Sequence, residues 1–183
     1  MSRIPYPVVE TLPDDVRKIV EKADLNALRM FAHATPEAFV HFYPFMAAFF
    51  SVSKLPADLR QIAVLRAGHI AGCDYVIRQH SALARDVGLG EAALSAIREG
   101  SSPPAVLTPA QHAVLIFADE VIRDANASDA ALAEVRRHLD DSQVMDLMMV
   151  IGIYMMLSRL ILTSGAEVDA HSMGTSYLDK LHN

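Results

Sequence analysis

The residues best suited to chemistry in this sequence are a single thiol, Cys73, and an imidazole seven residues later, His80. Gly72 favours the end of one helix, so we expect Cys73 to begin the next one. There the positive end of the helix dipole and free backbone N–H groups favour the reactive thiolate. Seven residues return an α-helix to nearly the same face, which places Cys73, Val76 and His80 on one stripe.

This pair has two interpretations, and its spacing alone does not choose between them. Two helical turns separate the backbones of Cys73 and His80 by about 10 Å, so a water, a substrate or a reoriented side chain must link them. In the first interpretation they form a nucleophile and its proton partner. In the second, Cys73 is a small buried hydrophobe and His80 is a core or interface histidine.

The elements that must position these side chains are predicted to be helices, because strand signals are weak and helix-ending residues are frequent. Thr35 and Pro36 begin one of these helices, which Pro44 is expected to kink or split. Thr108 and Gln111 form a capping box at the start of another. We predict a single all-α domain, residues 1–183, of about eight helices near residues 16–30, 36–50, 56–72, 73–87, 91–98, 109–124, 129–139 and 143–163. Residues 166–183 are predicted to form a tail.

Composition excludes several classes of protein. The net charge is −6 and no dense Lys/Arg run is present, so nucleic-acid binding has no electrostatic support. One cysteine allows neither an internal disulfide nor a zinc site built from thiols, and it fits a reducing cytoplasm. The apolar run 147–157 is predicted to be too short to cross a bilayer. Residues 143–163 are apolar on nearly every side of a helix, so we expect a homo-oligomer that covers them.

The segment around the thiol resembles a known signature. Gly72-Cys73-Asp74-Tyr75, then His80, then residues 84–89 (ARDVGL) resemble the signature of the carboxymuconolactone decarboxylase and alkylhydroperoxidase-D-like superfamily, here within residues 55–100. Residues 25–36, residues 152–156 and the pair Glu167 and Asp169 resemble flanking segments of longer members. The resemblance implies an all-α fold, assembly as dimers, trimers or hexamers, and no cofactor or metal. It also implies either decarboxylation of a small lactone acid or thiol-based hydroperoxide reduction.

Peroxidase-type members of this superfamily carry a Glu, then Cys-x-x-Cys with a His between the cysteines, then another His. These positions fall on Gln61, Cys73, Tyr75, Val76 and His80 in this sequence. Without a second thiol, no internal disulfide can close a catalytic cycle, and glutamine cannot shuttle a proton as glutamate does. The first hypothesis is therefore a one-cysteine peroxidase in which Cys73 attacks the peroxide, His80 handles the proton, and an external thiol reduces the sulfenic acid.

Two other functions stay open. A decarboxylase or lyase of a small carboxylated lactone or aromatic-catabolism intermediate would use His80 as the acid, with Tyr75 and Gln61 on the carboxylate or carbonyl. Arg66 or Arg78 could anchor the acid group. Alternatively, the chain is a non-catalytic helical binding protein that kept the fold and lost the chemistry.

Substrate-binding candidates outside the signature lie on the first long helical segment. Asn26, Arg29 and His33 share one helical face by the three-to-four rule and could reach a pocket together with Val76. No His-Glu-x-x-His, glycine-rich phosphate loop or Gly-x-Ser-x-Gly motif is present in the sequence.

Overall fold

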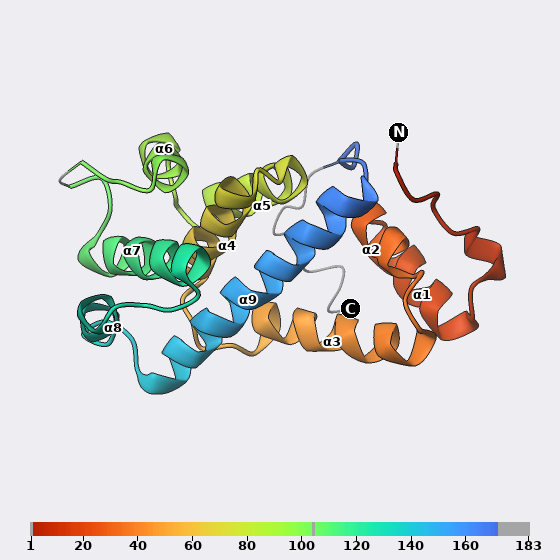
Figure 1. The fold of residues 1–183 in the computed structure, drawn as a ribbon, viewed down its shortest axis with the longest axis horizontal. Coiled ribbons are helices and arrows are strands. Elements are labelled where there is room, and N and C mark those ends of the chain that lie inside the picture. The colour runs from red at the N-terminus through yellow and green to blue at the C-terminus, as the bar shows by residue number, and fades with distance from the viewer. Residues whose placement is uncertain (1, 104, 172–183) are drawn as a thin grey trace.

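The computed structural model describes residues 2–103 and 105–171 of the chain. These residues form nine α-helices and one 3-10 helix and contain no strand, which confirms the predicted all-α fold (Figure 1). In chain order the elements are η1 (Val9–Thr11), α1 (Asp14–Ala23), α2 (Asn26–Phe31), α3 (Pro36–Ser51), α4 (Ala57–Ala71), α5 (Asp74–Asp86), α6 (Glu91–Glu99), α7 (Pro109–Asp124), α8 (Asp129–Val135) and α9 (Asp141–Ser164). The predicted tail lies mostly outside the described residues.

The helix boundaries differ from the prediction at two places. The single helix expected over residues 16–30 is two helices, because Asp24 adopts a left-handed conformation with φ of 46° and ends α1. Pro44 does not split α3, which continues through it. The proline removes only the N–H that would bond to the Val40 carbonyl.

The predicted helix signals account for most of the remaining boundaries. The Thr108 hydroxyl accepts from the Gln111 backbone, and the Gln111 side chain accepts from the Thr108 backbone, so the capping box that begins α7 is complete. Gly72 ends α4 with φ of 65°, as expected for a glycine cap. Thr35 is the residue before α3 as predicted, but its side chain makes no capping hydrogen bond.

Helix α4 is the centre of the fold. Every residue from 59 to 68 is buried, and α4 packs against α5, α7 and α9. Figure 1 shows α9 crossing the molecule diagonally, between the group of α6, α7 and α8 and the group of α1 and α2. One hydrophobic core joins α4 to α6, α7, α8 and α9, a second lies between α1, α2 and α3, and a third surrounds a cavity between α3, α5 and α9.

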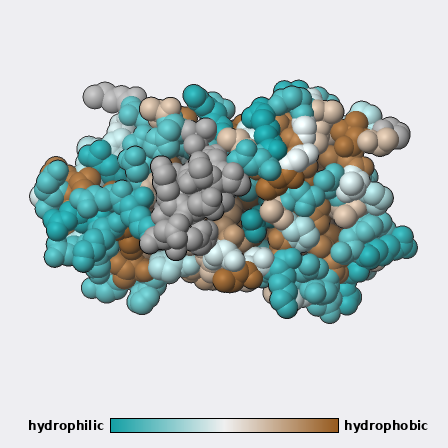
Figure 2. All heavy atoms as spheres, turned by 180° about the vertical axis from the view of Figure 1, so that it is seen from behind, coloured by the Kyte–Doolittle hydropathy of each residue, from teal (hydrophilic) through white to brown (hydrophobic). Residues whose placement is uncertain are grey.

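The apolar run of 147–157 lies within a longer helix than the sequence suggested. Helix α9 has 24 residues and is, by length and composition, the one described helix long and apolar enough to cross a membrane. However, 50% of its apolar window is buried inside the protein, on the face that carries Leu147, Val150, Ile151 and Tyr154. A buried core helix passes the same test of length and hydropathy. Seen from behind, the surface is mostly hydrophilic, and smaller hydrophobic patches interrupt it (Figure 2).

Candidate functional site

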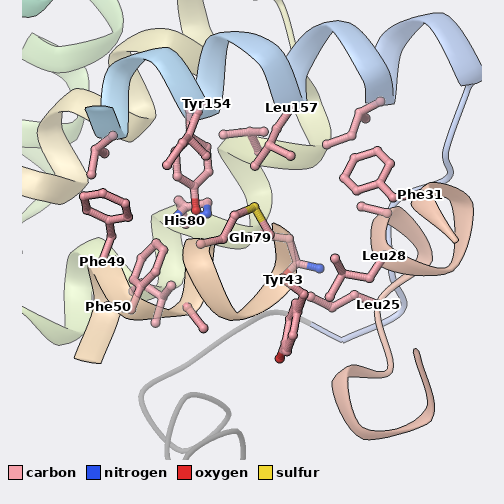
Figure 3. Close-up of a pocket in the computed structure, with 18 of the residues that line it drawn as sticks. Leu25, Leu28, Phe31, Tyr43, Phe49, Phe50, Gln79, His80, Tyr154 and Leu157 are labelled. Atoms are coloured by element: carbon pink, nitrogen blue, oxygen red, sulfur yellow. The ribbon is translucent and has the colours of Figure 1, made fainter. Parts of the chain in front are cut away.

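A cavity of about 410 Å³ lies between α3, α5 and α9, and α2 closes one end of it (Figure 3). This volume falls in the range of pockets that bind small molecules, about 300–1,000 Å³. Most of the wall is apolar, and it includes Leu25, Leu28, Phe31, Phe49, Phe50, Tyr75, Val76, Gln79, His80, Tyr154 and Leu157. Three of the predicted site residues, Tyr75, Val76 and His80, line this cavity.

His80 is the histidine that α5 directs into the cavity. It is 2% exposed, and its Nδ1 lies 2.9 Å from Oε1 of Gln61 on α4. With Oε1 as the acceptor, Nδ1 carries the proton and Nε2 keeps its lone pair. Burial, with a smaller contribution from the charge of Arg60, lowers the pKa of His80 to about 3. The imidazole is therefore neutral across the physiological pH range.

Close packing of α4 against α5 sets the bond between Gln61 and His80. Gly68 lies opposite Val76, and a Cβ at position 68 would come within 3.0 Å of Val76 Cγ1. The absence of a side chain at Gly68 therefore lets the two helices approach closely. Val76, in the position where peroxidase-type relatives have a second cysteine, fills the space between the helices and also reaches the cavity wall.

An aromatic cluster covers the His80 end of the cavity. The rings of His80 and Tyr154 are edge-to-face, with centroids 4.8 Å apart, and Phe50 lies 6.2 Å from His80. Figure 3 shows Tyr154 extending from α9 with its oxygen towards His80. The Tyr154 hydroxyl makes no hydrogen bond to the described part of the chain. Burial raises the pKa of Tyr154 strongly and Arg60 opposes this shift, so the phenol stays protonated.

Arg60 is a buried cation next to this cluster. It is 7% exposed, its Nη1 donates to the Phe49 carbonyl at 2.8 Å, and its guanidinium lies over the Phe50 ring, 4.9 Å from the centroid. Its Nε is buried without a hydrogen-bond partner, and no carboxylate of the described residues lies within ion-pair distance. Burial lowers the pKa of Arg60, although a guanidinium remains charged in proteins.

Cys73 begins α5 as predicted, but the structure places it beneath the cavity wall. It is 0% exposed, and it packs among Val76, Tyr154 and Leu157 without lining the cavity. Burial raises the pKa of its thiol, although the backbone of Val76, the nearby Ser158 hydroxyl and the backbone of Tyr75 act to lower it. The expectation that the helix start favours the thiolate is thus wrong in sign, because desolvation outweighs the helix N-terminus.

Tyr75 and Gln79 turn their polar ends towards a buried carboxylate at the other end of the cavity. The Tyr75 hydroxyl donates to Asp169, and Gln79 Nε2 donates to the same Oδ2 at 2.7 Å. The other oxygen, Oδ1, accepts from the Asn26 backbone N–H at 2.7 Å. Asp169 is 6% exposed, so these bonds fasten the segment after α9 onto α2 and α5.

The three predicted residues of the α2 region do not reach the cavity. The Asn26 side chain donates to the Glu167 carbonyl, Arg29 donates to the Pro7 carbonyl, and His33 Nε2 lies 2.7 Å from the Pro5 carbonyl. They share one face, as predicted, but this face holds the N-terminal and C-terminal segments. The neighbouring face of α2, with Ala27, Leu28 and Phe31, lines the cavity instead.

The two arginines predicted as anchors for an acid group also lie elsewhere. Arg66 pairs with Asp119 on α7 and donates to the carbonyls of Ile97 and Arg98. Arg78 is exposed on α5. Arg60 and Tyr154 were not among the predicted site residues, because an arginine inside a helix and a tyrosine in a methionine-rich helix give no signal of a catalytic role. Within the described residues, no group of three His, Cys, Asp or Glu side chains is placed to hold a metal ion.

Comparison with known proteins supports the resemblance seen in the sequence. Residues 34–120 match the model of the carboxymuconolactone decarboxylase family. This segment contains Arg60, Gln61, Cys73 and His80, whereas Tyr154 and Asp169 lie outside it. No curated protein matches the chain at a significant level.

Solved structures share the fold over most of the chain. A protein of unknown function from Agrobacterium tumefaciens, assigned provisionally to the antioxidant defence protein AhpD, is 25% identical with a TM-score of 0.68, over 77% of this chain and 97% of that one. An uncharacterised peroxidase-related protein from Ralstonia eutropha with an AhpD core is 24% identical with a TM-score of 0.77, over 92% and 93%. The debrominase Bmp8 is 18% identical with a TM-score of 0.72, over 98% and 97%, and was also solved with 2,3,4-tribromopyrrole.

Proposed function

Because this chain belongs to the carboxymuconolactone decarboxylase and alkylhydroperoxidase-D-like superfamily, we propose that it is a small-molecule enzyme in which His80 transfers a proton without a cofactor. The observation that carries the proposal is the neutral imidazole facing an apolar cavity of about 410 Å³, with Nδ1 fixed by Gln61. Nε2 makes no hydrogen bond to the described residues and is left for a ligand. The reaction class is lyase-like or isomerase-like chemistry on a small carbonyl or lactone compound.

In the proposed step, His80 Nε2 takes a proton from the carbon next to the substrate carbonyl. The C–H electron pair forms a carbon–carbon double bond, and the carbonyl π pair moves to oxygen, which gives an enolate and an imidazolium. The imidazolium then returns the proton to carbon. His80 therefore acts first as a base, not as the acid of the sequence hypothesis, because its lowered pKa leaves almost no imidazolium before the reaction. The negative charge of the enolate favours the protonated histidine when it forms.

One experiment separates this proposal from the thiol hypothesis. Small cyclic ketones and lactones are incubated with the protein in D₂O, and deuterium incorporation next to the carbonyl is followed by NMR. We expect exchange with wild type and with Cys73→Ser, and at least about a hundredfold slower exchange with His80→Gln. The proposal would be contradicted if exchange continues at the wild-type rate in His80→Gln. It would also be contradicted if wild type exchanges none of the ketones and lactones tested.

A one-cysteine peroxidase is the second candidate. The backbone N–H groups at the start of α5 and the nearby Ser158 hydroxyl favour it, because they act to lower the pKa of the Cys73 thiol. The thiolate would attack a peroxide oxygen, forming an S–O bond while the O–O bond breaks and an alcohol leaves with a proton. An external thiol would then form a mixed disulfide with Cys73 and release water, and a second thiol would restore Cys73. Turnover of hydroperoxide would be measured with a small thiol as the reductant. This function would be favoured if Cys73→Ser abolishes the turnover and His80→Gln weakens it. Absence of both activities in wild type would indicate a non-catalytic binding protein.

We also propose that a second copy of the chain covers the exposed side of α9. Met145, Met149, Met156 and Leu160 form one helical stripe opposite the buried face, and each is at least 40% exposed. Methionine side chains adapt to an irregular partner surface, and an apolar stripe of this length is unusual on a monomer. We expect wild type to be oligomeric by light scattering and Met156→Lys to have a lower molar mass. The control Ala92→Lys, on the exposed face of α6, should leave the mass unchanged, and a monomeric wild type would refute the proposal.

A further inference from the structure

The polar groups of the cavity are unequally available to a ligand. Tyr75 and Gln79 donate to Asp169, so their polar ends are used by the protein. At the opposite end, Tyr154 and His80 contribute a hydroxyl and an imidazole, with their rings 4.8 Å apart. Tyr154 is 7% exposed, and its hydroxyl makes no hydrogen bond to the described residues. A phenol buried in this way needs a hydrogen-bond partner, which a ligand can provide.

The charges behind the cavity wall make its two ends different. Arg60 lies behind Phe50, at the end where Tyr154 and His80 meet. Asp169 lies behind Tyr75 and Gln79 at the other. Positive charge therefore faces a ligand at one end and negative charge at the other. Such an arrangement orients a polar or anionic molecule before any reaction takes place.

We infer that the Tyr154 hydroxyl, with the positive charge of Arg60 behind the Phe50 ring, binds an anionic oxygen of the ligand. The ligand class is a small, mostly apolar ring compound that carries one such oxygen, either an enolate or a phenolate. Its ring contacts Phe31, Leu28 and Leu157, and its oxygen lies beside His80. This inference rests on the proposed function, because it names the group that stabilises the enolate formed when His80 removes a proton.

Arg60 also has a structural role, and the test must separate the two. Its Nη1 binds the Phe49 carbonyl, one of the last carbonyls of α3, where the negative end of the helix dipole favours a cation. This interaction alone would stabilise the fold without affecting ligands. Arg60 acts on the ligand through Phe50 and the local field, so it is a positioning residue. Variants of Arg60 must therefore be tested by a quantity that a loss of stability does not change, such as the pKa of a bound probe.

The experiment uses 4-nitrophenol as the probe, because its neutral and anionic forms absorb differently. Binding to wild type is titrated below and above the pKa of the free phenol. We expect the phenolate to bind at least as tightly as the phenol, so that the pKa of the bound probe stays at or below that of the free probe. In Tyr154→Phe the phenolate should bind roughly tenfold to a hundredfold more weakly, because a hydrogen bond to a charged group is lost. The affinity for the neutral phenol should change much less.

Three further variants complete the test. Tyr43→Phe is the matched control, since the Tyr43 hydroxyl points away from His80 in Figure 3, and it should retain the phenolate preference. Arg60→Gln should raise the pKa of the bound probe, while Arg60→Lys keeps it low, and circular dichroism checks that both variants fold. His80→Gln should still bind the phenolate. Failure of the proposed proton transfer can therefore be distinguished from failure of the proposed binding of an anionic oxygen. Wild type that binds only the neutral phenol, or binds neither form, would overturn the inference, as would an unchanged Tyr154→Phe.

Discussion

Lowering the pH from 6.5 to 4 is expected to remove about 3 kcal/mol from the free energy of unfolding through His80 alone. The pKa of His80 is about 3 in the folded protein, against an ordinary value of 6.5. Between these values the unfolded chain binds a proton that the folded chain does not, so stability falls as the pH falls. Each pH unit costs about 1.4 kcal/mol while this difference lasts. Below about pH 3 both states are protonated and the loss stops.

The measurement is urea unfolding of wild type and His80→Gln at several pH values between 4 and 7. His80→Gln should lose about 3 kcal/mol less than wild type over this range, whatever its stability at pH 7. The matched control is His112→Gln, which replaces an exposed histidine near the start of α7, and it should show the wild-type dependence. If wild type and His80→Gln have parallel profiles, then His80 is not buried in its neutral form. The proposed role of His80 as a base would fail with it.

The all-α fold could be predicted because its signals are local. The glycine at position 72 and the capping box at Thr108 act within one turn of helix, and both are used as predicted. Asp24 was missed because a non-glycine residue in the left-handed region gives no clear signal in sequence. Pro44 was misjudged because tertiary packing keeps a helix continuous despite one lost hydrogen bond.

The candidate site could be predicted only where one helix carries it. The relative positions of Cys73, Val76 and His80 are set by α5 alone. However, helical spacing does not reveal which side of α5 faces a cavity and which side packs in the core. The cavity receives His80 and Val76, while Cys73 lies against Ser158 beneath the wall. The contributions of Arg60 and Tyr154 depend on how α4 and α9 pack around α5. Such long-range contacts cannot be inferred from the spacing of residues in one segment.

Arg66→Met is expected to lower the free energy of unfolding by about 2–4 kcal/mol, because it removes a buried cation that is bonded to a partly exposed carboxylate and to two backbone carbonyls. The Arg66 side chain is 5% exposed and bridges Asp119 on α7 to the last carbonyls of α6. Gly100 leaves room for the guanidinium, since a Cβ there would come within 2.2 Å of Nη2. Methionine fills part of the space but leaves Asp119 with Arg123 alone and the carbonyls without their donor.

Urea unfolding at pH 7 measures this loss, and Arg78→Met is the control, because Arg78 is exposed and its loss should change stability by less than about 0.5 kcal/mol. The same two variants separate the roles of the arginines. If Arg66 is structural and Arg60 sets the charge at the cavity, then folded Arg66→Met should bind 4-nitrophenolate as wild type does. A weaker affinity for the phenolate in Arg66→Met would instead support the role that the sequence suggested for Arg66, as an anchor for an acid group of the ligand. An unchanged unfolding free energy would show that the ion pair between α4 and α7 contributes no net stability.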